Sequence, residues 1–183
     1  MTALIYAALG LLGLNTGLII LIFCNFGMVK ALDNLPKGQA AWFLWVGGVA
    51  ELIAAYFFFA GAGDTLDAAT FGGFGLFWMG LGTLILWGGA GEVLRPMAIA
   101  YTIFAIALTP AYFTVSYVLG ILLVMLVLVF VCIAAGAPAT VLGSVQLITF
   151  IVATVAIIGA VWYSTGNTTL MNASSWLLNH PNF

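Results

Sequence analysis

Glu51 is the most unusual chemical feature of this sequence, because it is the one acidic or basic residue inside the apolar stretch 40–60. A carboxylate in hydrocarbon is costly, so such a residue usually faces the interior of a helix bundle, a partner or a water-filled cavity. One interpretation makes Glu51 part of a solute or proton pathway. The other makes it an interhelical hydrogen-bonding group, with Gln146 or Asn25 as its partner. The sequence leaves both interpretations open.

Neutral polar residues occur inside other apolar stretches: Asn15, Asn25, Thr70, Gln146 and Thr149. A path for small polar solutes needs a few hydrogen-bonding groups between apolar constrictions. The same residue types also join neighbouring helices by hydrogen bonds in a bilayer. We take Asn15, Asn25, Thr70 and Gln146, together with Glu51, as candidates for the polar lining of a path.

The residues that enzymes commonly use are scarce. The single histidine, His180, lies near the end of the chain, so no Ser/His/Asp set can assemble inside the apolar region. Cys24 and Cys132 each lie in an apolar run without the four-ligand spacing of a metal site, and we interpret them as packing residues. We therefore expect no catalytic site, no metal and no cofactor, and instead a pore, a carrier or a structural subunit.

The amino-acid composition indicates whether the folded chain is surrounded by water or by lipid. Of the 183 residues, 65% are hydrophobic and 4% are charged, whereas a soluble domain has roughly 25% charged residues. The solvent must then be lipid, and at about 20 residues per crossing the chain can cross a bilayer about six times. We predict an all-α integral membrane protein, a six-helix bundle over residues 1–163 with a short polar or interfacial tail over 164–183. Three basic residues exclude a nucleic-acid partner.

Six apolar blocks, separated by polar or turn-forming segments, are the predicted transmembrane helices: residues 3–29, 40–60, 68–87, 97–116, 117–135 and 141–163. The segments 61–67 and 88–96 are predicted connections. The boundary at residues 112–117 carries no charge, and Pro110 marks either a helix end or a kink. Five helices, one of them long and kinked, are therefore the alternative.

Glycines are abundant, and several of them share a helix face. Gly10, Gly13 and Gly17 are three and four residues apart, and five more crowd the third block: Gly72, Gly73, Gly75, Gly80 and Gly82. Small residues let helices approach closely in a bilayer. This pattern indicates tight packing, and a narrow pore would need the same closeness.

The basic residues Lys30, Lys37 and Arg95 fall in the first and third connections, which share one side of a six-helix arrangement. The positive-inside rule makes that side cytoplasmic. We expect an integral protein of the cell (plasma) membrane with both termini outside.

Three stretches carry a resemblance to a known family. Residues 47–51 read Gly-Gly-Val-Ala-Glu, residues 70–78 read Thr-Phe-Gly-Gly-Phe-Gly-Leu-Phe-Trp, and residues 10–27 run from Gly-Leu-Leu-Gly to Asn-Phe-Gly. They resemble the acetate uptake transporter (succinate–acetate permease) family, which has Gly-Gly-x-Ala-Gln, Asn-Thr-Phe-Gly leading to Ser-Tyr-Gly-x-Phe-Trp, and Gly-Leu-x-Gly leading to Asn-x-Gly.

The resemblance implies a homohexamer of six-helix protomers, each with its own path for small monocarboxylates that move with protons or as the neutral acid. In that family a Phe, a Tyr and a Leu narrow the path, and the matching positions here are Leu14, Phe74 and Leu126. Two departures weaken the match to acetate. The signature Asn-Pro-Ala-Pro-Leu-Gly falls on residues 5–10, where only Leu9-Gly10 survives, and Glu51 replaces a glutamine.

A second family, the proton-gated urea and short-amide channels, shares the six-helix, hexameric plan. Pro36-Lys37 leading to Gly47-Gly48, and Arg95-Pro96 followed by Pro110, resemble stretches of these channels. Their pores are rich in tryptophan on the fifth helix, whereas residues 117–135 contain none.

Three hypotheses about function follow. The first is a channel or transporter for small weak acids such as acetate, and the alternative is a urea or amide channel. The third is a non-transporting structural subunit of a membrane complex, which would keep the packing glycines and lose the signature motif.

Overall fold

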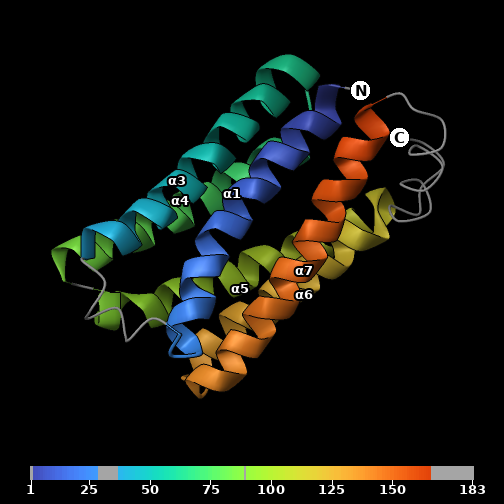
Figure 1. Ribbon diagram of the computed structural model, residues 1–183. Helices are drawn as coiled ribbons and strands as arrows, with labels where there is room; N and C mark the ends of the chain where they lie inside the picture. The colour runs from blue at the N-terminus through green and yellow to red at the C-terminus, as the bar shows by residue number, and fades with distance from the viewer. Residues whose placement is uncertain (1, 29–36, 89, 166–183) are drawn as a thin grey trace.

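The computed structural model describes residues 2–28, 37–88 and 90–165, and over these residues the chain forms six long helices (Figure 1). Each is long and apolar enough to cross a membrane. Their bounds are α1 Thr2–Asn25, α3 Lys37–Phe57, α4 Thr65–Trp87, α5 Ala90–Val115, α6 Tyr117–Ala135 and α7 Ala139–Ser164, with one π-helical turn, η1 Phe58–Ala62, continuing α3. The predicted all-α membrane bundle is confirmed.

Successive helices run in opposite directions, and α1 lies between α3 and α7 (Figure 1). Around the bundle the helices follow the order α4, α3, α1, α7, α6, α5, and α4 meets α5 only sparsely. The α1 span has the largest buried share of the six, 56%. Residues of α3 and α7 are therefore separated by α1.

The uncertain boundary between the fourth and fifth helices is a real helix break. Ser116 has extended backbone (φ −157°, ψ 128°), and its hydroxyl accepts a hydrogen bond from the amide of Leu119 at 3.5 Å. Such a residue ends one helix and caps the next. Pro110 lies within α5 and does not end it, so six helices, not five, is correct.

Two predicted connections were too long. The predicted connection 61–67 extends too far, because α4 begins at Thr65. The Asp64 side chain caps this helix by accepting a hydrogen bond from the amide of Asp67 at 3.0 Å. The connection 88–96 is wrong because α5 begins at Ala90 and includes Glu92, Arg95 and Pro96. Pro96 has no N–H to donate to the carbonyl of Glu92, which is an exposed residue near the helix start.

Reciprocal glycine contacts bring α3 close to both of its neighbours. A methyl group on Gly13 would lie 2.5 Å from the Gly47 carbonyl oxygen, and one on Gly47 would lie 2.7 Å from the Gly13 oxygen. Gly48 of α3 and Gly75 of α4 form a second pair, with corresponding distances of 2.6 and 2.9 Å. The close packing predicted from the glycines is confirmed at these two crossings.

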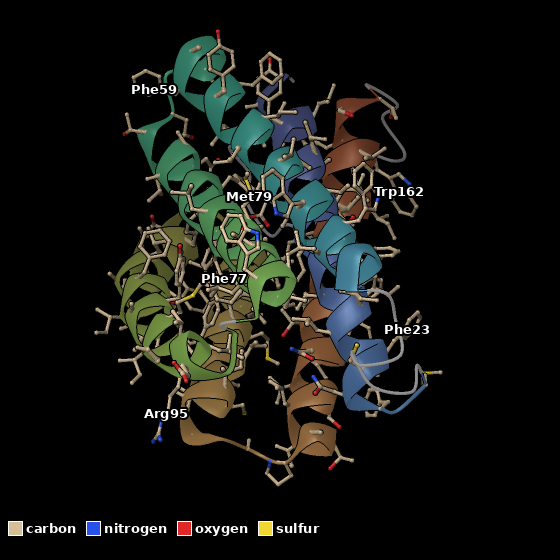
Figure 2. The ribbon with its side chains drawn as sticks, turned by 90° about the vertical axis from the view of Figure 1, so that its left-hand side faces the viewer. Phe23, Phe59, Phe77, Met79, Arg95 and Trp162 are labelled. Atoms are coloured by element: carbon tan, nitrogen blue, oxygen red, sulfur yellow. The ribbon has the colours of Figure 1, made fainter. Side chains whose placement is uncertain are left out.

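The two ends of the bundle differ in charge. Lys37 begins α3, and Glu92 and Arg95 lie near the start of α5, at one end, whereas Asp64 precedes α4 at the other, where α1 begins and α7 ends (Figure 1). Figure 2 shows Phe59 and Arg95 near opposite ends, with the Arg95 side chain pointing away from the helices. Lys30 and the predicted tail beyond Thr165, including His180, lie outside the described residues.

The glycine crossings predict a sharp difference between two Gly→Ala substitutions in α3. Gly48→Ala places a methyl group 2.6 Å from the Gly75 oxygen, and overpacking of this kind costs about 1–3 kcal/mol. Gly38→Ala is the matched control, because nothing lies within 4 Å of its added methyl group. Unfolding in mixed detergent micelles should show a loss of stability for Gly48→Ala alone. Equal stability of the two variants would contradict the crossing geometry.

Candidate functional site

A small interior cavity, with a volume of about 40 Å³, is enclosed by residues of α1, α3, α4, α5 and α6. Its walls are mostly leucine and phenylalanine side chains, and its polar groups are Glu51, Asp67, Thr70 and Tyr112. The predicted constriction residues Leu14, Phe74 and Leu126 and the predicted polar residues Glu51 and Thr70 all line this one cavity.

The Glu51 side chain comes from the middle of α3 and is only 1% exposed. The Trp78 indole donates a hydrogen bond to Glu51 Oε1 at 3.2 Å, and Oε2 has no hydrogen-bond partner among the described residues. Glycines of both neighbouring helices make room for the side chain. A methyl group on Gly13 would lie 3.1 Å from Glu51 Cγ, and one on Gly75 would lie 3.2 Å from Glu51 Cβ.

The predicted interhelical partners of Glu51, Gln146 and Asn25, are wrong. Asn25 of α1 donates to Gln146 Oε1 of α7 at 2.7 Å, so these two residues bind each other. Since α1 lies between α3 and α7, the side chain of Gln146 is held on the opposite side of α1 from Glu51. The partner of Glu51 is instead Trp78, from α4.

The polar residues of α1 and α7 join those two helices. Asn15 of α1 donates to the Thr154 hydroxyl of α7 at 3.0 Å, as Asn25 does to Gln146, whereas the Thr149 hydroxyl donates to the Val145 carbonyl within α7 at 2.8 Å. Asn15, Asn25 and Gln146 do not line the interior cavity. Their placement favours helix–helix bonding over the path lining that we predicted for them.

Asp67 and Tyr112 are site residues that the sequence analysis missed. The Tyr112 hydroxyl donates a hydrogen bond to Asp67 Oδ1, which joins α5 to α4 at the edge of the cavity. Both residues had been assigned to predicted connections or boundaries. With α4 beginning at Thr65, one face of the helix carries residues at helical spacing: Asp67, Thr70, Phe71, Phe74 and Trp78. That spacing was the available signal.

A second and larger cavity, of about 240 Å³, adjoins the first. Ala7, Leu11, Asp67 and Leu119 line both, and the larger cavity also includes Asp64, which is half-buried. The smaller cavity is therefore approached from the end of the bundle at which α4 begins. Neither cavity is lined by a basic residue among the described residues.

Beyond Phe74, which lines the small cavity and stacks on Phe130, buried aromatic rings pack together. Phe77 packs against Phe130 and Tyr101 with ring centroids 5.0 and 4.9 Å apart, and the Tyr101 hydroxyl donates to the Gly73 carbonyl at 2.9 Å (Figure 2 labels Phe77). Phe77 and Phe130 are 1% and 2% exposed. We call Phe77, Tyr101 and Phe130 the aromatic cluster.

Over the described residues, no three His, Cys, Asp or Glu side chains come together as a metal-binding group. No family model, curated protein or solved structure matches the chain. The fold and the cavity therefore define a broad class, that of an integral membrane protein of six helices with two carboxyl groups in its interior.

The bond from Trp78 to Glu51 predicts an energetic coupling between α4 and α3. Trp78→Phe removes the indole donor and leaves Glu51 Oε1 unpartnered, at a cost of about 1–3 kcal/mol. In a Glu51→Leu background the same substitution should cost less, by about 0.5–3 kcal/mol. A double-mutant cycle measured by unfolding in mixed micelles tests this. Strictly additive effects would show that the bond does not form.

Proposed function

We propose that the protein is a channel or transporter that passes small weak acids, such as acetate-like monocarboxylates, across the membrane in their neutral form. The observation that carries this proposal is the small interior cavity that Leu14, Phe74 and Leu126 line together with Glu51. A neutral monocarboxylic acid has a short apolar body and one hydrogen-bonding end. Narrow apolar walls with a few polar groups are complementary to such a molecule.

The charges around the two cavities support the neutral form over the anion. Asp64, Asp67 and Glu51 line the cavities, and no basic side chain accompanies them among the described residues. A carboxylate anion would meet like charges in surroundings where water screens little. The uncharged acid avoids this repulsion.

Passage through the bundle also requires a movement. The aromatic cluster closes the interior beyond Phe74 and Leu126, so a solute in the small cavity can leave towards the Arg95 end only if these rings shift. We propose that the cluster is the gate of the path.

A short amide such as urea is the second candidate, and the polar groups of the small cavity favour it. Glu51, Asp67, Thr70 and Tyr112 all carry oxygens that can accept hydrogen bonds. Urea is uncharged and donates through its N–H groups, so the acidic lining does not repel it.

We propose further that the Lys37 and Arg95 end faces the cytoplasm, following the positive-inside rule, in the cell membrane. The Asp64 end, where the larger cavity lies, would then face outside together with both termini. The resemblance to the acetate uptake transporters supports a homohexamer. The large apolar side chains exposed on α3, among them Trp42 and Trp45, suit contact with lipid or with a second protomer.

Uptake into proteoliposomes tests the proposal. Labelled acetate should enter faster at acidic than at neutral external pH, because more of it is then uncharged. Leu126→Trp, which fills the cavity, should slow uptake by roughly tenfold, equivalent to about 1.4 kcal/mol in the barrier. Leu128→Trp is the matched control, since Leu128 is 43% exposed and Leu126 is 2% exposed.

Three outcomes separate the hypotheses. Uptake of urea without acetate would replace the first candidate with the second. Flux of neither solute, with co-purification of other subunits, would overturn both in favour of a structural subunit. Equal uptake by both tryptophan variants, each verified as folded by gel filtration, would remove the small cavity from the path.

A further inference from the structure

Two carboxyl groups at this site are held in the same way. In each, an aromatic side chain from a neighbouring helix donates to one oxygen: the Trp78 indole to Glu51 Oε1 at 3.2 Å, and the Tyr112 hydroxyl to Asp67 Oδ1. The donor fixes the orientation of each carboxyl group. For Glu51 it leaves the second oxygen, Oε2, without a partner, on a side chain that is one of those lining the small cavity.

Glu51 Oε2 is fully buried and has no hydrogen-bond partner among the described residues. A buried acceptor without a partner costs about 1–3 kcal/mol, and more if it is charged. A species that binds there must therefore bring a hydrogen or a positive charge. The surrounding cavity, of about 40 Å³, has room for about one or two water molecules, and a larger molecule enters it only when the surrounding side chains move.

Shared lining residues join the small cavity to the Asp64 end of the bundle. Asp67 and Ala7 line both cavities, so the larger cavity beside Asp64 leads to the smaller one. Along α4, Asp67 and Trp78 are about 16 Å apart at about 1.5 Å per residue, so Glu51 lies deep in the bundle. Towards the other end, the rings of the aromatic cluster pack against one another.

We propose that Glu51 is a proton-binding site of the protein, loaded through water from the Asp64 end of the bundle alone. A hydronium ion that reaches the small cavity past Asp67 transfers its proton to Oε2. One O–H bond breaks, one forms, a water molecule remains, and the carboxylate becomes neutral. The proton site deepens the proposed function. It rests on that function only in the use of the bound proton for transport.

The titratable groups around Glu51 are few. Asp67 comes from α4, Tyr112 and Tyr101 come from α5, and Asp64 lies farther out in the larger cavity. The side chains that α1 and α6 contribute to the small cavity are alanine and leucine only. Among these groups, Glu51 therefore has one acidic neighbour in the small cavity, Asp67, and no basic side chain that would compete with it for the proton.

Labelling with dicyclohexylcarbodiimide tests the proton on Glu51. This apolar reagent adds to a protonated carboxyl group, and the adduct rearranges to a stable acylurea without loss of a leaving group. With the protein in liposomes and no cargo present, peptide mass spectrometry should find the adduct on Glu51, less of it as pH is raised, and none in Glu51→Gln. Glu92→Gln, which alters an exposed acid at the other end, should retain it. No adduct on Glu51 at any pH would overturn the proposal.

Cysteine accessibility tests the sidedness. In a Cys24→Ala/Cys132→Ala background, Ala7→Cys should react with a small cationic methanethiosulfonate, forming a mixed disulfide and releasing a sulfinate, from one face of the vesicle only. Glu92→Cys should react from the other face, and the lipid-facing Leu76→Cys from neither. Reaction of Ala7→Cys from both faces, from the Glu92 face or from neither would contradict one-sided access. Labelling without acetate flux would overturn the proposed cargo and leave the proton site intact.

Discussion

The carboxyl group of Glu51 must be held inside a bundle whose outer surface faces lipid, and the packing of three helices meets this requirement. Gly13 of α1 and Gly75 of α4 leave space for the Glu51 side chain, and Trp78 supplies one hydrogen bond. The same glycines form the close crossings with Gly47 and Gly48. Tight packing and the placement of the acid thus depend on one set of residues, and a larger side chain at either glycine would disturb both.

The asymmetry of the interior follows from how residues are distributed along α4. Near its start are the acids Asp64 and Asp67 and the adjoining cavities, and farther along, Phe77 packs into the aromatic cluster. Polar groups that need water therefore lie towards one end, and rings that exclude it lie towards the other. This arrangement suits the proposed binding of a solute or a proton from one side of the bundle.

Composition alone predicted the fold, because a chain with 4% charged residues has few alternatives to a bundle in lipid. The site was harder to predict. A helix surrounded by lipid and apolar neighbours is apolar on every face, so hydropathy does not show which face is interior. Asn25 and Gln146 were accordingly assigned to a path, whereas they bind each other between α1 and α7. Asp67 was missed because it was assigned to the connection 61–67, and Tyr112 because it was assigned to the boundary at residues 112–117. Leu14, Phe74 and Leu126 were proposed from a family resemblance that no comparison supports, and yet they lie together around Glu51.

The central claim is that the Glu51 carboxyl group is in contact with water while it lies deep in the membrane bundle. Infrared difference spectroscopy of the protein in liposomes, comparing the wild type with Glu51→Gln, tests this claim directly. We predict a carbonyl band of a protonated carboxyl group that is absent from Glu51→Gln and that shifts promptly when H₂O is exchanged for D₂O. A band unaffected by D₂O, or identical spectra for the two proteins, would contradict the account.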